Sequence, residues 1–196
     1  LDSNRKKARK NMTPPDNAFS YLAVLYSIIL GLAFTDILQG FRRLLLARKG
    51  MVFYGPPLIL ALLLLLVLAQ TWWAMFALRS HDHWTFASYG VILLHCIVLY
   101  MVCSLVLPDE KDLRAGYYAH SRAFFSLIVV ADVVGLIRDA VLYGSLTWGP
   151  NLYSQLAIAG LAGVAAVTHN RWYHMILAPA GLVGYLAYVG LLFWQL

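Results

Sequence analysis

The sequence predicts an all-α protein that crosses a membrane six times, and its composition and long apolar runs support this. Of the 196 residues, 61% are hydrophobic and 12% are charged, whereas a soluble domain is about 45–50% apolar and about 25% charged. A chain with so little charge cannot cover a surface that faces water. The composition therefore excludes a soluble enzyme, a disordered linker and a disulfide-rich secreted scaffold.

The first three predicted helices are apolar runs that end at helix-breaking or charged residues. About 20 residues cross a hydrocarbon core of about 30 Å, and residues 18–38, 57–78 and 84–107 are each about that long. The first run stays apolar as far as Leu46, and a Gly-Pro-Pro sequence leads into the second. Pro108 and the charged residues after it end the third, because proline and charge are disfavoured in lipid. The runs do not alternate in polarity as the strands of a barrel do.

The last three predicted helices are residues 123–143, 152–168 and 172–194, of which the middle one is the shortest of the six. Pro179 lies inside the last helix and should kink it. Small residues four apart, such as Ala159 and Gly163, let neighbouring helices approach closely. We expect these residues to mediate packing within the bundle, with a contact between subunits as the alternative.

A basic and polar tail, residues 1–17, precedes the first helix, and we expect residues 18–196 to form a single transmembrane domain. The chain starts at Leu1, while Met12 precedes a sequence typical of an ordinary N-terminus. Residues 1–11 are therefore interpreted as a tag remnant, an upstream extension or a processed end.

The net charge of +6 is concentrated beside the apolar runs. Leaving the tail aside, the basic residues outside the helices lie on connections 39–56, 108–122 and 169–171, and these are Arg42, Arg43, Arg48, Lys49, Lys111, Arg114, Arg122 and Arg171. Only Arg79 lies on the other side. The positive-inside rule predicts that the three basic connections are cytoplasmic and both termini external. We expect a multi-pass protein of a bacterial inner membrane that contacts anionic lipids and, without a soluble module, binds no nucleic acid.

Two similar sequence pairs suggest an internal repeat. Asp36 and Arg42 in the first helix match Asp132 and Arg138 in the fourth, and a Gly-Pro pair follows 19 and 17 residues after the respective aspartates. Two units of three helices each must lie in opposite orientations in the bilayer, which is a common plan of secondary transporters. Chance similarity is the alternative explanation.

Ionisable residues inside the predicted helices are the candidate functional site. A charged residue in mid-membrane costs about 2.5–3.5 kcal/mol on insertion scales and by default suggests function. The candidates are Asp36, Asp132, Arg138 and Asp139, with Gln39 as a polar neighbour. If the first and fourth helices face each other, Asp36 pairs with Arg138, and the fourth-helix aspartates pair with Arg42 or Arg43. The alternative is that these residues form structural ion pairs, and this role is favoured for Arg138 and Asp139.

His95 lies inside the third predicted helix. We expect it to hydrogen-bond to a neighbouring helix, with a proton relay or a haem ligand as alternatives. A haem held by two histidines would need a second histidine that points inward. His169 and His174 are instead predicted to lie in a connection at the membrane surface.

Two further patterns are interpreted as unremarkable in function. Residues 81–83, His-Asp-His, have a metal-like spacing but no further ligands nearby, and are predicted to form a polar loop. Cys96 and Cys103 are seven residues apart, about 10 Å along a helix, which is too far for a disulfide because its Cα atoms lie within about 7 Å.

The leading functional hypothesis is an integral membrane transport protein, a channel or carrier for a cation or small solute, without enzymatic activity or cofactor. Asp36 and Asp132 form its charged site in this hypothesis, with Gln39 and His95 as polar neighbours. The sequence holds no hydrolase, phosphate-loop or dinucleotide pattern. The alternative is a non-transporting anchor, scaffold or sensor subunit of a larger complex. A homo-oligomer is a further expectation, because six helices enclose a small interior and a pore forms more easily between subunits.

Overall fold

The protein is all-helical in the computed structural model, which describes residues 14–46, 52–80, 84–109, 112–145 and 148–194. These residues form six α-helices and one short 3-10 helix: α2 (Pro14–Leu46), α3 (Gly55–Ala74), η1 (Met75–Ser80), α4 (Phe86–Leu105), α5 (Leu113–Tyr143), α6 (Pro150–Val167) and α7 (Arg171–Trp194). The predicted fold class is confirmed. Residues 1–11 and 81–83, on which two sequence interpretations were based, lie outside the described residues.

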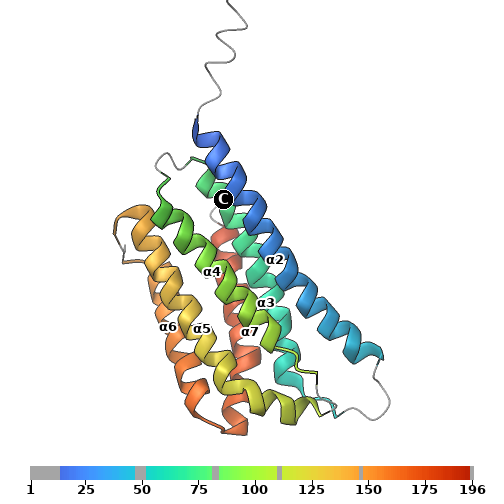
Figure 1. The fold of residues 1–196 in the computed structure, drawn as a ribbon. Coiled ribbons are helices and arrows are strands. Elements are labelled where there is room, and N and C mark those ends of the chain that lie inside the picture. The colour runs from blue at the N-terminus through green and yellow to red at the C-terminus, as the bar shows by residue number, and fades with distance from the viewer. Residues whose placement is uncertain (1–13, 47–51, 81–83, 110–111, 146–147, 195–196) are drawn as a thin grey trace, which may run out of the picture.

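Five of the described helices are long and apolar enough to cross a membrane, namely α2, α3, α4, α6 and α7. The remaining helix, α5, carries Asp132, Arg138 and Asp139 in its second half. It lies between α4 and α6 (Figure 1). Successive helices run up and down, so that α3, α5 and α7 all begin at one end, called the lower end here (Figure 1). The described arginines of the three basic connections lie at this lower end. Their cytoplasmic location remains a prediction.

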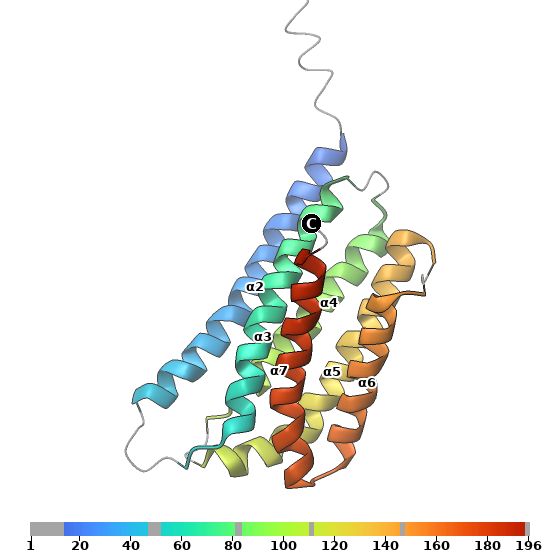
Figure 2. The ribbon, with the colours of Figure 1, turned by 180° about the vertical axis from the view of Figure 1, so that it is seen from behind.

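The start of α5 differs from the predicted boundary, because residues 113–122 are helical rather than a connection. Asp112 caps the helix, and its Oδ1 accepts hydrogen bonds from the backbone N–H groups of Arg114 and Ala115 at 2.9 and 3.0 Å. Leu113, Tyr117 and the following buried positions recur every three to four residues, which is the spacing of one helix face. The first turns of α5 run across the lower end before the helix turns upward (Figures 1 and 2).

The helices pack as two groups that share α4. Helix α5 packs on α4 and α6, helix α2 packs on α4 and α3, and α7 packs chiefly on α3 (Figure 2). The α3–α7 contact includes a hydrogen bond from the Tyr185 hydroxyl to the carbonyl of Leu66 at 3.0 Å. In the suggested inverted repeat, helices α2, α3 and α4 correspond to α5, α6 and α7. The contact between α2 and α4 would then have a counterpart between α5 and α7. Because α5 packs on α6 and α4 instead, the packing does not follow the suggested symmetry. Likewise, the small residues of α6 pack little against α7.

The interior is lined by one stripe of each helix. On α2 the buried residues include Leu22, Tyr26, Leu30, Ala33 and Ile37, spaced three to four apart. The outer faces are also apolar, as expected for surfaces that contact lipid tails. Both cysteines are buried and free, so the prediction that they do not pair with each other is confirmed.

The lower ends of α2 and α4 are held together by a close contact and an ion pair. Gly40 of α2 lies against Leu107, where an added Cβ would come within 2.8 Å of the Leu107 Cβ and Cδ1 atoms. Next to it, Arg43 Nε lies 2.6 Å from Asp109 Oδ1, and Arg43 Nη2 donates to the carbonyl of Leu107 at 3.2 Å. The absence of a side chain at Gly40 therefore sets how closely α2 approaches α4.

The substitution Gly40→Ala is expected to destabilise the protein by about 1–3 kcal/mol, because overpacking a close contact displaces its neighbours. Thermal unfolding in detergent micelles measures the effect. Gly31→Ala is the matched control on the same helix, since an added Cβ there meets nothing within 4 Å and alanine favours the helix. Equal melting temperatures for the two variants would contradict the role given to Gly40.

Candidate functional site

A polar cluster joins α4, α5 and α6 inside the bundle. Arg138 and Asp139 are neighbours on α5, and Arg138 Nη2 lies 2.7 Å from Asp139 Oδ1. Arg138 Nη1 also donates to Nδ1 of His95 on α4 at 3.1 Å. From α6, the amide Nε2 of Gln155 donates to Asp139 Oδ2 at 3.4 Å. The Arg138 and Asp139 side chains are only 25% and 15% exposed, so this ion pair is largely buried inside the protein.

The hydrogen bonds fix the orientation of both outer members of the cluster. A guanidinium group can only donate, so Nδ1 of His95 accepts from Arg138 and Nε2 carries the ring proton. An ionised carboxylate can only accept, so Gln155 presents its NH2 group to Asp139. The other ends of these side chains, His95 Nε2–H and Gln155 Oε1, are then a donor and an acceptor that the Arg138–Asp139 pair does not use.

Gly135 of α5 faces both of these groups, and it has no side chain to separate them. An added Cβ at Gly135 would lie 3.8 Å from both His95 Nε2 and Gln155 Oε1, an ordinary van der Waals distance. Gln155 Oε1 is buried and has no hydrogen-bond partner among the described residues. A buried acceptor without a donor costs about 1–3 kcal/mol. A small polar molecule over Gly135 would satisfy it.

Asp132 extends the polar groups along the same helix. It lies three residues before Gly135 and seven before Asp139, positions that share one face of α5. Its Oδ2 atom is also buried without a described hydrogen-bond partner. From Asp132 to Asp139 the polar face is about 10 Å long, about one third of a hydrocarbon core of about 30 Å.

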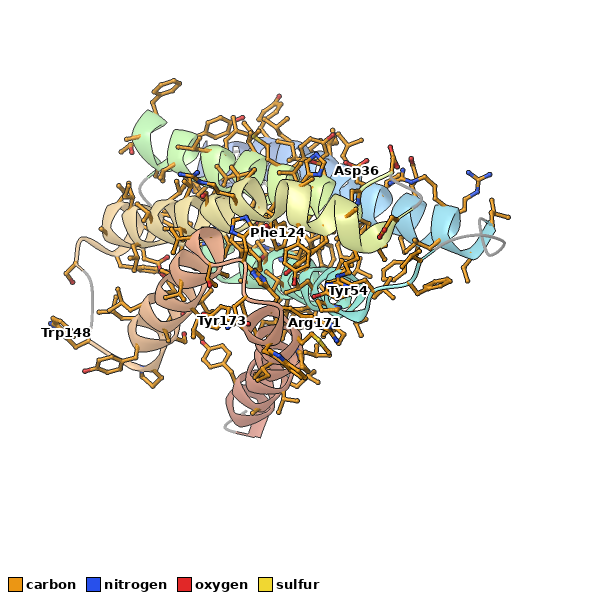
Figure 3. The ribbon with its side chains drawn as sticks, turned by 90° about the horizontal axis from the view of Figure 1, so that it is seen from below. Asp36, Tyr54, Phe124, Trp148, Arg171 and Tyr173 are labelled. Carbon is orange, nitrogen blue, oxygen red and sulfur yellow. The ribbon has the colours of Figure 1, made fainter. Side chains whose placement is uncertain are left out.

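The structure brings together three of the predicted site residues, His95, Arg138 and Asp139, and places Asp132 on their helix face. Asp36 lies elsewhere, on α2, with α4 between α2 and α5 (Figures 1 and 3). It lies on the side of α2 that is packed near Cys103 of α4, whose thiol is within reach of the Asp36 charge. Gln39 is exposed on α2 and is not part of the cluster.

The predicted ion pairs between the first and fourth helices are wrong. Among the described residues, Arg138 pairs with its neighbour Asp139 rather than with Asp36, and Arg43 pairs with Asp109 rather than with an α5 aspartate. The reason is the packing order, because α2 meets α4 and not α5 along this length. Asp36 and Asp132 thus lie on helices that pack on α4, and no described hydrogen bond or ion pair joins the two aspartates.

Sequence reasoning missed Gln155, and it placed Gly135 near the helix face of Asp132 and Asp139 without giving it a role. A signal was present for Gln155, because an amide side chain inside the shortest apolar run has to find a hydrogen-bond partner on another helix. Helical spacing placed Gly135 near the aspartate face, but its contacts depend on which side chains of α4 and α6 face it.

His174 was also misjudged, because it is completely buried rather than part of a surface connection. It lies in the first turns of α7, where Tyr117 donates its hydroxyl proton to Nδ1 at 2.9 Å. Nε2 donates to the carbonyl of Thr168 at 2.9 Å, because a carbonyl can only accept. His174 thus ties α7 to α5 and to the end of α6. This position is at the lower end, and its bonding partners differ from those of His95.

No three His, Cys, Asp or Glu side chains of the described residues are close enough together to hold a metal ion. The chain matches no protein-family model, no curated protein and no solved structure. The fold and composition define a helical membrane protein with several apolar helices, and its candidate site is the polar cluster of α4, α5 and α6.

Proposed function

We propose that this protein is an integral membrane transport protein, a channel or carrier for a small cation or polar solute. The proposal places its site on the polar face of α5, between His95 of α4 and Gln155 of α6. The observation that carries the proposal is the pair of buried acceptor oxygens, Asp132 Oδ2 and Gln155 Oε1, which have no described donor. A cluster that serves only to join helices has no use for open acceptors, because each one costs stability.

The charges of the cluster divide the site into two parts. Arg138 and Asp139 neutralise each other, so the space over Gly135 suits an uncharged hydrogen-bonding group. Asp132 has no described ion-pair partner. When ionised it favours a cation or a proton, as intramembrane carboxylates do in transporters. In the proposal, Asp132 therefore binds a cation or proton, and His95 and Gln155 bind an uncharged polar solute.

Two substitutions test this arrangement in reconstituted liposomes. Asp132→Asn is expected to lower cation or proton flux by about tenfold or more, since a hydrogen bond to a charged group is worth about 1.5–3 kcal/mol. Gly135→Ala fills the space without a clash and is expected to reduce solute flux to that of protein-free liposomes. Flux is followed with pH- and potassium-sensitive dyes, and by swelling in glycerol and urea.

Gly90→Ala on α4 is the control for Gly135→Ala, because an added Cβ there meets nothing within 4 Å. Both changes replace a helical glycine by a better helix former, so both variants should fold. Wild-type liposomes that move none of these solutes would overturn the transport proposal. Flux that Gly135→Ala and Asp132→Asn leave unchanged would overturn the site.

The alternative function, a non-transporting anchor, scaffold or sensor subunit, is supported by a different observation. The bonds from Arg138 to His95 and from Gln155 to Asp139 join three helices, as structural polar contacts in membranes do. In this alternative, wild-type liposomes are impermeable, and Asp132→Asn changes thermal stability only.

A further inference from the structure

Two tyrosine hydroxyl groups meet at the lower end of the bundle. Tyr54 directly precedes α3, and its hydroxyl oxygen lies 2.9 Å from that of Tyr118 on α5. Their ring centroids are 5.9 Å apart, which places both rings at the junction of α3 and α5. One hydroxyl donates to the other, so the second hydroxyl keeps its proton available for a ligand.

Two arginines lie one helical turn from this pair and its ring neighbour. Arg114 precedes Tyr118 by four residues on α5, so the two share a helix face. Arg171 precedes His174 by three residues on α7, and the ring centroids of His174 and Tyr118 are 5.5 Å apart. Arg114 is in the first turn of α5 and Arg171 is the first residue of α7, and both are exposed. Figure 3 shows Tyr54 and Arg171 near each other when the bundle is seen from below. Burial raises the pKa of the Tyr54 hydroxyl, as does its bond with Tyr118, whereas the charges of Arg114 and Arg171 lower it. Both guanidinium groups therefore act on the same hydroxyl.

The two positive charges have no counter-ion within the described part of the chain. The ion pairs described there are Arg43–Asp109 and Arg138–Asp139. Asp112 is close in sequence to Arg114, but its carboxylate caps α5 through Oδ1. Two like charges beside one tyrosine pair favour an anion between them.

The two tyrosines and two arginines, called the patch here, lie where apolar helices begin, and lipid headgroups are expected at the ends of such helices. Helices α3 and α7 begin beside it, so it marks the end of two apolar spans. Trp172 is exposed beside it, and the Arg171 guanidinium carbon lies 5.6 Å from the Trp172 ring centroid. Tryptophan and tyrosine rings concentrate at this interface. An anion bound here is therefore within reach of the phosphate of a lipid in the same leaflet.

We infer that Arg114, Arg171 and the Tyr54–Tyr118 hydroxyl pair bind the headgroup phosphate of an anionic phospholipid. The arginines supply charge and N–H donors, and the free tyrosine hydroxyl supplies an O–H donor to a phosphate oxygen. This inference does not depend on the proposed transport function.

The test measures lipid affinity by native mass spectrometry of the detergent-solubilised protein with added phosphatidylglycerol, phosphatidylcholine or inorganic phosphate. The double variant Arg114→Gln/Arg171→Gln is expected to lose about 30-fold in affinity for phosphatidylglycerol, from the contributions of two basic residues near the membrane surface. Tyr54→Phe/Tyr118→Phe keeps both rings and should lose about 3-fold or more, because a donor is removed.

The control Arg42→Gln/Arg122→Gln removes the same charge from exposed positions at the same end and is expected to change affinity little. An equal loss in this control would overturn the inference, since the binding would then reflect surface charge in general. An affinity for inorganic phosphate equal to that for phosphatidylglycerol would also overturn the inference, because the site would then bind a soluble anion.

Discussion

Replacing Asp139 with alanine is expected to destabilise the protein by about 3 kcal/mol, because it leaves the Arg138 charge largely buried without its partner. The same change removes the acceptor for the Gln155 amide. Chemical or thermal unfolding in detergent micelles measures the loss. It is one of the two largest effects we expect, since breaking a buried pair costs more than the pair contributes.

The double variant Arg138→Met/Asp139→Leu distinguishes this cause from a simple loss of packing. Removing both charges together leaves no uncompensated ion, so the double variant should be more stable than Asp139→Ala. Asp109→Ala is the exposed counterpart, because Arg43 and Asp109 are 45% and 77% exposed and such pairs are worth about 0–1 kcal/mol. Similar losses in Asp139→Ala and Asp109→Ala would contradict the buried role.

The second large effect is expected for His174→Ala, with a loss of about 3–5 kcal/mol. A completely buried ring is removed, which leaves a cavity, and both the Tyr117 hydroxyl and the Thr168 carbonyl lose a hydrogen-bond partner. The melting temperature in detergent reports the change.

His169→Ala is the matched control, because His169 is exposed five residues earlier in the chain and surface substitutions change stability by about 0.5 kcal/mol or less. Tyr117→Phe removes one of the two hydrogen bonds of His174 and keeps the ring, so it should lie between the control and His174→Ala. A melting temperature of His174→Ala equal to that of His169→Ala would show that the buried contacts contribute nothing.

The helices themselves could be predicted from the sequence, but their pairing could not. Apolar runs of about 20 residues are sufficient to identify a membrane helix, and α4, α6 and α7 begin and end within about two residues of the predicted positions, which is the usual uncertainty of helix ends. Pairing is different, because lipid tails are as apolar as the helix faces and give no hydrophobic preference among partners. The expected contact between the first and fourth helices was therefore wrong.

The residues of the candidate site could be predicted in part, but their partners could not. Charge inside an apolar run predicted Asp132, Arg138 and Asp139 as candidates, and a polar side chain in mid-helix predicted His95; the structure brings His95, Arg138 and Asp139 together. Adjacent helix residues do not ordinarily face each other, so the sequence favours a partner for Arg138 on another helix. The long arginine side chain instead contacts both its neighbour and His95.

The polar first turns of α5 explain the error at His174. Residues 113–122 contain Arg114, His120 and Arg122, and this polarity favours a connection over a membrane span, whereas in the structure they form the first turns of α5. Once these turns cover the lower end, the residues beneath them are shielded from water. His174 is one of them, although its sequence neighbours Arg171 and Trp172 are exposed.

The contact of α7 with α3 has a consequence for how the chain is made. Tyr185 and Leu66 are 119 residues apart in sequence, so the face of α3 that receives α7 stays uncovered while the ribosome synthesises three intervening helices. Contacts between distant segments form late, and an uncovered surface in a nascent chain is exposed to wrong partners. The contact of α7 with α3 therefore forms only after the three intervening helices have been made, and a chain released before α7 would enter the bilayer with this face of α3 unprotected.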